Sequence, residues 1–327
     1  MQSLKRPLLT RALAVAAFAL GTLAALPAAA QEFPTRPIRI VIGAPAGEAI
    51  DVIFRLFADK MGAQLGQSLF IDNRPGAAGM IGLDAIINSA PDGYTIGLLQ
   101  SPTLISGLFN GREWKPDQEM TPIALDYRQG VLLSINPNVA IFKDVKGPAD
   151  LVRVVKANPG KVNFGTIGPG STGHLVGELM KNRAGLKWEH IAYKGGVPLI
   201  QAVAAGSDPI VGIGTSLQDV DKNPGRVVVV ATSAGRAQGP YRPLAEAGFP
   251  EIDATTWGGM VGPARMPAAI QNRILTAYKA AYDSPDVSER AGKILIQEYM
   301  APPEFGQLIR SHIANWGKVI KENNIHP

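Results

Sequence analysis

The stretch Phe164–Leu179, FGTIGPGSTGHLVGEL, decides the fold more than any other part of this chain. Its pattern predicts a short strand, then a loop with Gly165, Gly168 and Gly170, then a helix that begins near Ser171–Thr172. The backbone N–H groups of the first helical turn have no partner within the helix, and they lie at the positive end of its dipole. The segment therefore predicts a binding site for an anion such as a carboxylate or a phosphate.

A second segment of the same kind lies near the start of the chain. Residues 38–61, IRIVIGAPAGEAIDVIFRLFADKM, predict a strand, a turn at Gly47 and a helix with Asp51 in its first turn. An acidic residue at that position satisfies unpaired N–H groups, so we expect Asp51 to shape its loop. Two loops that can bind an anion suggest two lobes that hold one small acidic ligand.

Residues 1–30 are typical of a secretory signal. Lys5, Arg6 and Arg11 precede an apolar run over Ala12–Leu26, and Ala28–Ala30 form a cleavage site before Gln31. A membrane anchor is the alternative, but the run is shorter than the roughly 20 residues that span a bilayer. We therefore expect a cleaved, periplasmic protein without stable membrane insertion. The chain has no cysteine, and its charges are too interspersed to indicate a nucleic-acid partner.

The chain alternates between strand-like and helix-like segments, which favours an α/β fold with largely parallel sheets. Breaks that resemble linkers occur near Gln129–Gly130 and Ala254–Trp257. They predict one lobe from residues 31–130 plus 256–327 and a second, inserted lobe from residues 131–255. Two crossings of this kind produce a hinged cleft that can close on a ligand.

The apolar periodicity predicts individual elements along the chain. Expected strands are Ile38–Gly43, Ser68–Ile71, Tyr94–Leu99, Val131–Ile135, Val162–Phe164, His190–Tyr193, Pro209–Ile213 and Val227–Thr232. Expected helices are Gly82–Ser89, Pro148–Ala157, Thr172–Arg183, Val197–Ala204 and an amphipathic helix from Phe305 to Ile320 that packs on the first lobe.

Patterns that indicate catalysis or a cofactor are weak or missing. Gly168–Gly173 matches G-x-G-x-x-G, but Glu189 opens the next strand, whereas a dinucleotide site needs an acidic residue at its end. The four histidines have no metal-ligand spacing, and no serine nucleophile motif or P-loop occurs. We expect no cofactor, no metal, no catalytic residues and no enzymatic activity. His174 can reach a ligand or tie the loop to its own helix, and Lys194 can offset a carboxylate or lie on the surface.

Five segments in order resemble the Bug family, the periplasmic solute receptors of tripartite tricarboxylate transporters. They are FPTRPIRIVIGAPAGEAID at residues 33–51, DNRPGAAGMIG at 72–82, PDGYTI at 91–96, GTIGPGSTGHLVGE at 165–178 and YKG at 193–195. The resemblance covers essentially the whole chain after the signal.

The resemblance implies a two-lobed, periplasmic-binding-protein-like (Venus flytrap) fold with a ligand cleft between the lobes and without catalysis. It implies a monomer that captures a carboxylate between the loops Ala44–Asp51 and Gly165–Ser171 and delivers it to a membrane permease. A loop around Gln100–Thr103 would read the far end of the ligand. The expected ligand-binding residues are Ala46, Gly47, Glu48, Asp51, Gln100, Ser101, Thr103, Thr166, Gly168, Gly170, Ser171, His174, Lys194 and Asp208.

Three departures from the family pattern concern specificity. Glu48 follows Gly47 where the family has a second glycine, Ile50 replaces a small polar residue, and Gly212 replaces an acid, although Asp208 is kept. Glu48 would repel a second carboxylate, so we expect a monocarboxylate, an amino-acid-like or an aromatic ligand. Two other functions stay open: a receptor that docks on a sensor protein, and an exported enzyme that uses Asp51, His174 or Lys194.

Overall fold

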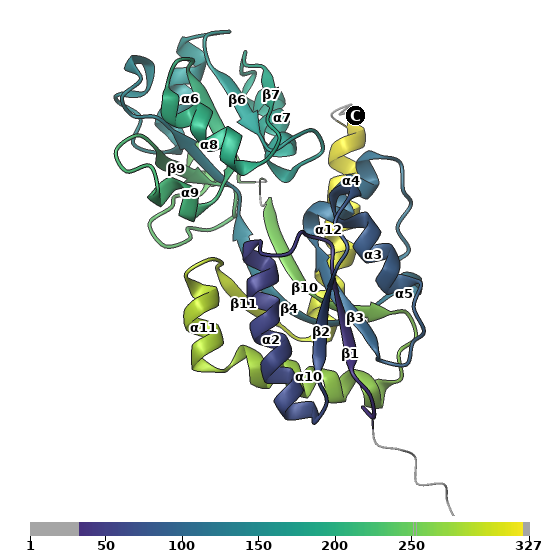
Figure 1. Ribbon diagram of the computed structural model, residues 1–327. Helices are drawn as coiled ribbons and strands as arrows, with labels where there is room; N and C mark the ends of the chain where they lie inside the picture. The colour runs from purple at the N-terminus through teal and green to yellow at the C-terminus, as the bar shows by residue number, and fades with distance from the viewer. Residues whose placement is uncertain (1–32, 251, 253, 323–327) are drawn as a thin grey trace, which may run out of the picture. The chain divides into compact units, whose positions relative to one another are not determined.

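The computed structural model describes residues 33–322, apart from residues 251 and 253. The expected signal, residues 1–30, lies outside the described residues, so its cleavage stays a prediction. From Arg36 onward the chain folds into one compact unit that contains two β-sheets (Figure 1). Among the described helices, none is long and apolar enough to cross a membrane.

The first sheet has six strands in the order β11-β4-β10-β3-β1-β2. They are β1 (Ile38–Ile42), β2 (Leu69–Asn73), β3 (Thr95–Gln100), β4 (Met120–Gly130), β10 (Thr255–Pro263) and β11 (Gln297–Met300). The helices that accompany it are α2 (Ala49–Leu65), α3 (Met80–Ile87), α4 (Ser101–Phe109), α5 (Pro116–Glu119), α10 (Ala268–Tyr282), α11 (Pro285–Gly292) and α12 (Pro302–Glu322), with a 3₁₀ turn over Ala77–Gly79.

The second sheet has five strands in the order β7-β6-β8-β5-β9. They are β5 (Leu132–Ile135), β6 (Asn163–Thr166), β7 (His190–Ala192), β8 (Ile210–Thr215) and β9 (Val228–Thr232). The helices that accompany it are α6 (Pro148–Ala157), α7 (Thr172–Ala184), α8 (Gly196–Ala205) and α9 (Leu217–Asp221), with 3₁₀ turns over Ala140–Phe142 and Leu244–Ala247.

Both sheets are mixed, which corrects the expectation of largely parallel sheets. In the first sheet β1 runs parallel to β2 and β3, but β10 runs antiparallel to β3 and β4, and β11 antiparallel to β4. In the second, β6 runs parallel to β7 and β8, whereas β5 runs antiparallel to β8 and β9. The antiparallel members include β4, β5 and β10, the strands next to the points where the chain passes between the sheets (Figure 1).

The two segments that resemble linkers are paired strand ends, which corrects that interpretation. Gly130 lies opposite Thr255, and Trp257 lies opposite Arg128 in the antiparallel β4–β10 pair. Trp257 is fully buried and donates a hydrogen bond of 3.2 Å from Nε1 to His312 Nδ1, so it packs inside the molecule beneath the crossing. The strands of the second sheet all fall between β4 and β10 in the sequence, as an inserted lobe requires. The lobe boundaries at residues 130 and 255 stay a prediction.

Helix α12 contacts the cores of both sheets. Phe305 and Ile309, near its start, are buried in a cluster with β4 and β10 residues such as Leu125. Trp316, further along, is buried in the cluster that contains Phe164 of β6. The expectation that this helix packs on the first lobe is therefore confirmed, because Trp316 also shares its cluster with Ile105 and Phe109 of α4, but the second half of α12 contacts the core of the second sheet as well.

Asp126 is an ionisable group buried inside the first sheet. It lies where the β4–β10 register shifts between Leu125 and Tyr127, and only 1% of it is exposed. Neither carboxylate oxygen makes a well-formed hydrogen bond within the described part of the chain. Burial raises the pKa of Asp126 to about 7, and the Tyr278 hydroxyl offsets part of the increase.

We predict that Asp126→Asn stabilises the protein at neutral and alkaline pH. The folded protein keeps this carboxyl protonated up to about pH 7, whereas the unfolded chain releases the proton near 3.8. The wild-type free energy of unfolding therefore falls as pH rises from the unfolded pKa to the folded pKa, and it stays at the lower value above that range. The total loss is about 1.4 kcal/mol for each unit by which the two pKa values differ. Urea unfolding at about pH 4 and about pH 8 measures this loss, which the variant should largely lack.

The control for this experiment is Asp117→Asn, because the Asp117 side chain is 72% exposed. Its pH profile of unfolding should follow the wild type. If Asp126→Asn also loses stability in parallel with the wild type between the two pH values, the carboxyl of Asp126 is not responsible for the loss.

Candidate functional site

The loop between β6 and α7 has a backbone that requires glycine. Gly168 and Gly170 have φ angles of 134° and 72°, in the region that disfavours residues with a side chain. Ser171 caps α7: its Oγ accepts a hydrogen bond of 3.2 Å from the His174 N–H and donates one of 2.7 Å to the Gly168 carbonyl oxygen. The loop and the first turn of α7 therefore form one hydrogen-bonded structure.

The first turn of α7 lies directly against β8. A Cβ atom on Gly173 would lie 2.4 Å from the carbonyl oxygen of Ile213, so no larger residue fits there without moving the helix. In the same helix, a Cβ atom on Gly177 would lie 2.2 Å from the Phe164 ring. These two glycines allow the helix to pack close to the sheet and fix the position of its N-terminus.

Thr172, the first residue of α7, has a buried hydroxyl group without a partner. The residue is 3% exposed, and Oγ1 has no hydrogen-bond partner among the described residues. A buried hydroxyl in this condition costs free energy unless a ligand or water satisfies it. The unpaired N–H groups of the first helical turn lie beside it. Together they supply donors for an anion.

Hydrogen bonds and ring stacking of His174 and His190 hold the loop between β6 and α7. His174 Nδ1 accepts a hydrogen bond of 3.2 Å from Gly170 N–H, and its ring stacks on His190 with 4.2 Å between centroids. Thr166 Oγ1 lies 2.7 Å from His190 Nε2 and also accepts a bond from Gly168 N–H. Burial lowers the pKa of both histidines, that of His190 to about 4 with a further contribution from His174. Both rings are therefore neutral at pH 7, and His174 ties the loop to its own helix.

The first loop is organised by Asp51, which is 1% exposed. Its carboxylate accepts hydrogen bonds from Gly47 N–H at 2.8 Å, from Arg55 at 2.9 and 3.0 Å and from Asn73 Nδ2 at 2.9 Å. Burial alone would raise the pKa of Asp51, but these hydrogen bonds outweigh it and hold the pKa below its usual value. The carboxylate thus shapes the loop. The neighbouring residues Ala46, Gly47 and Glu48 are exposed.

The expected loop over Gln100–Thr103 does not exist. Gln100 ends β3, and Ser101 begins α4 immediately, because Pro102 is favourable in a first helical turn. Ser101 Oγ is buried and accepts a bond from Trp257 N–H, whereas Thr103 Oγ1 donates to the Ala78 carbonyl oxygen.

The structure gives the surroundings of three other expected ligand-binding residues, whose role stays a prediction. Gln100 Nε2 donates a hydrogen bond of 2.9 Å to the Tyr127 hydroxyl. Lys194 and Asp208 are exposed. Ile50 is buried in the core at 8% exposure, so it packs inside the molecule.

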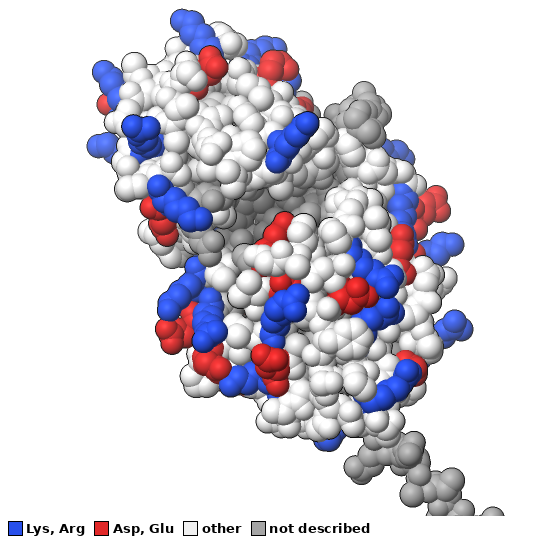
Figure 2. Space-filling model, in the orientation of Figure 1, with Lys and Arg blue, Asp and Glu red and all other residues white. Residues whose placement is uncertain are grey.

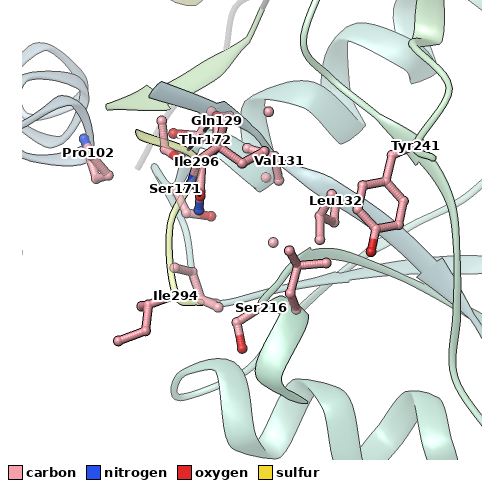
Figure 3. A pocket seen from close by; sticks show the side chains of 16 residues that line it. Pro102, Gln129, Val131, Leu132, Ser171, Thr172, Ser216, Tyr241, Ile294 and Ile296 are labelled. Atoms are coloured by element: carbon pink, nitrogen blue, oxygen red, sulfur yellow. Dashed lines mark hydrogen bonds between the residues drawn. The ribbon is translucent and has the colours of Figure 1, made fainter. Parts of the chain in front are cut away.

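A pocket lies where α7, the crossing strands and the segment before β11 meet (Figure 3). Tyr241, Leu132 and Ser216 border one side of it in Figure 3, and Ser171 and Ile294 border the other. The lining residues are Pro102, Gln129, Gly130, Val131, Leu132, Ile167, Ser171, Thr172, Gly173, Gly214, Ser216, Leu217, Tyr241, Thr256, Ile294 and Ile296.

Of the expected ligand-binding residues, Ser171 lines this pocket, and Thr166, Gly168, Gly170 and His174 build the loop beside it. The sequence interpretation missed the other walls. The sequence pattern could have indicated one of these walls. The segment Gly214–Leu217 joins a strand to a helix, as the two loops expected to bind an anion do. Tyr241, Ile294 and Ile296 come from irregular segments and had no such signal.

The described lining residues carry no charged side chain. Tyr241 is the titratable group among them, and burial, followed by the charge of Asp221, raises the pKa of its hydroxyl, so it is neutral at pH 7. Lys, Arg, Asp and Glu side chains are spread over the outer surface in Figure 2, and mostly uncharged atoms border the hollow across this face. An anion in the pocket would be held by N–H and hydroxyl groups.

Known proteins resemble this chain over most of its length. It matches the model of the tripartite tricarboxylate transporter family receptor over residues 53–325. It is 31% identical over 310 residues to a UPF0065 protein from the gbd 5′ region of Cupriavidus necator, covering 90% of each chain. It is 29% identical over 322 residues to protein BugT of Bordetella pertussis, covering 96% of this chain and 98% of BugT.

Solved structures share the fold. A TctC solute-binding protein from Polaromonas matches with a TM-score of 0.75 at 24% identity, over 89% of this chain and 99% of that one. An R. palustris protein solved with adipate matches with a TM-score of 0.71 at 26% identity, over 90% of this chain and 100% of that one. This chain therefore belongs to the tripartite tricarboxylate transporter receptor family, the TctC or Bug family of solute-binding proteins, and has its two-lobed periplasmic-binding-protein fold.

Proposed function

We propose that this chain is a periplasmic receptor that captures a small carboxylate at the first turn of α7 and delivers it to the permease of a tripartite tricarboxylate transporter. The observation that carries the proposal is the Thr172 hydroxyl, which is buried beside the helix N-terminus without a partner. A carboxylate oxygen satisfies such a donor, and hydrogen bonds to charged acceptors are the stronger ones. The free protein thus holds an unsatisfied donor that an anionic ligand can use.

The surroundings of Thr172 favour an anion over a neutral polar ligand. Helix α7 contributes its N–H groups and the positive end of its dipole, worth up to about 2 kcal/mol in a partly buried geometry. Gly173 brings this helix end against β8, and Ser171 fixes the preceding loop. The donors are therefore held in place before the ligand arrives, so little ordering is needed on binding.

A receptor fits the chain better than an enzyme. The family and the fold are those of solute-binding receptors. The described pocket residues include no pairing of a nucleophile with a histidine or carboxylate base. The adipate found in one structural neighbour supports a carboxylate as the ligand class. Delivery to a permease rests on family membership, and a sensor protein would receive the same loaded receptor.

We predict that small carboxylates raise the melting temperature of the purified protein. A ligand at 100 times its dissociation constant stabilises the folded state by about 2.7 kcal/mol. A thermal-shift screen of malate, adipate, hexanoate and benzoate measures this effect, and native mass spectrometry first shows whether a ligand is already bound. A folded, ligand-free protein that responds to no carboxylate would contradict the proposal.

We predict that Thr172→Val weakens carboxylate binding without destabilising the free protein. Valine has nearly the same shape but no hydroxyl, so the free protein loses only an unsatisfied buried group and should unfold at the same or a higher urea concentration. The ligand loses one charge-assisted hydrogen bond, worth about 1.5–3 kcal/mol, so its dissociation constant should rise about tenfold or more. Isothermal titration calorimetry measures the change.

The matched control for this variant is Thr276→Val in α10. Thr276 is exposed, and its Oγ1 donates to the Asn272 carbonyl oxygen of the same helix. This substitution removes the same atom outside the pocket, so affinity should not change. Equal affinities of the wild type and Thr172→Val would show that the α7 hydroxyl does not contact the ligand.

A further inference from the structure

We infer that the protein has a second binding pocket, for a small organic anion with an apolar body, on the other face of the β4–β10 crossing from the pocket that Thr172 lines. The pocket at Thr172 is called the first pocket below. The second pocket is a cavity of about 520 Å³ between α7, α12 and the crossing ends of β4 and β10. This volume lies within the roughly 300–1,000 Å³ of cavities that bind small molecules.

The crossing strands separate the two pockets. Successive side chains of a strand point to opposite faces of its sheet. Gln129 and Thr256, which lie opposite each other in the β4–β10 register, both line the first pocket. Their neighbours Arg128 and Thr255 both line the second pocket. The second pocket is therefore a separate site on the other face of the same two strands.

His312 supplies an unsatisfied hydrogen-bond donor at the second pocket. It lines the cavity, is 7% exposed, and accepts at Nδ1 the hydrogen bond from Trp257 Nε1. Burial, with a contribution from the charge of Arg128, lowers the pKa of His312 to about 3, so the ring is neutral at pH 7. Because an indole N–H can only donate, the proton of the neutral imidazole is on Nε2. This buried N–H has no acceptor among the described residues, which costs free energy until a ligand or water supplies one.

The charged side chains of the second pocket are mainly positive. Arg128, Arg183 and Lys318 line it. Glu322 is the acid among the described lining residues, and it lies 3.8 Å from Lys318. Glu298, outside the lining, lies 3.9 Å from Arg128. In the described part of the chain these two acids only partly offset the three cations, so the acceptor that best suits the His312 N–H is an anion such as a carboxylate.

Most of the other lining residues are apolar, which favours a ligand with an apolar body. These apolar residues, all buried or half-buried, are Leu179, Ile252, Ala254, Leu308, Trp316 and Val319. The polar residues Ser311 and Asn315 are exposed, and the Thr255 hydroxyl already accepts a hydrogen bond of 3.0 Å from Arg128 Nε. Burying an apolar ring or chain against these walls is favourable in proportion to the area removed from water.

Crystals of residues 31–327 grown with 4-bromobenzoate would locate the site directly. This probe has one carboxylate on an apolar ring, and anomalous scattering from its bromine marks where it binds. We expect bromine in the second pocket, with a carboxylate oxygen within hydrogen-bond distance of His312 Nε2. Bromine in the first pocket alone, or in neither pocket, would overturn the inference, and the former result would support the proposed function.

The nuclear magnetic resonance signal of the His312 Nε2–H measures affinity at the second pocket in solution. In protein labelled with ¹⁵N at histidine, its loss in His312→Asn identifies the signal, or in His312→Gln if that variant does not fold. Titration with 4-bromobenzoate should move this signal in the wild type and in Thr172→Val alike. The uncharged 4-bromobenzamide should bind about tenfold more weakly, because it cannot form a charge-assisted hydrogen bond. A signal that does not move, or that responds equally to the amide, would overturn the inference.

Removing exposed cations tests the second pocket without altering its buried residues. The double variant Arg183→Gln with Lys318→Gln should bind 4-bromobenzoate about threefold more weakly, since exposed charge pairs contribute little individually. Arg153→Gln with Lys321→Gln is the control, because it removes two exposed cations outside the described lining. Equal affinities of the two double variants, measured from the His312 signal, would show that these cations do not hold the anion and would overturn the inference.

Discussion

The pairing of β4 with β10 is the constraint on which the rest of the structure depends. These long antiparallel strands run from Met120 opposite Pro263 to Gly130 opposite Thr255. Strand β4 leads directly into β5 of the second sheet, and β10 follows the irregular segment after β9. Ser233 joins the two crossings: its Oγ accepts from Val131 N–H and donates to the Ala254 carbonyl oxygen. Its backbone bonds to the same two residues. The chain thus passes between the sheets through two strands that are hydrogen-bonded at the crossing itself.

The crossing also forms part of the pocket. Gly130 must be a glycine there, because a Cβ atom would lie 2.0 Å from Thr232 Oγ1. Gln129 and Thr256, one from each crossing strand, line the same pocket as Thr172. A ligand in this pocket, as proposed, would therefore touch both the second sheet and the strands that connect it to the first. In the proposed receptor, a change in the angle between the sheets would act on the ligand contacts through these strands and would couple closure to binding.

The sequence predicted the local elements well, because their signals lie within short windows. The helix over Pro148–Ala157 has the expected bounds, and α7 begins at Thr172 as the glycine loop and Ser171 indicate. The strands β4 and β10 were missed for a physical reason. Pro122 and Asp126 interrupt the first, and a Gly258–Gly259 pair interrupts the second, so neither has the alternation of a strand with one buried face. These two strands are stabilised by pairing with each other, and no short stretch of the sequence contains both of them.

For the same reason, the sequence could predict one end of the pocket but not the other. The proposed anion-binding end depends on residues 165–173, which are contiguous, and their chemistry is visible in the sequence. The apolar end depends on Leu132, Tyr241 and Ile294, which are far apart in the chain and meet only after the crossing strands have formed. At the first loop, Gly47 N–H, Arg55 and Asn73 satisfy the Asp51 carboxylate, and the expected contact of this loop with a ligand stays a prediction.

A pocket of N–H groups and hydroxyls selects its ligand differently from one that contains arginine. Fixed dipoles such as the α7 N-terminus stabilise one anion at one place, and they need little reorganisation when it binds. An arginine on a long side chain would follow a second carboxylate to several positions and would accept ligands of several lengths. In the proposed receptor, the place of the bound charge would therefore depend on where α7 begins, and the close contact of Gly173 with Ile213 fixes that place.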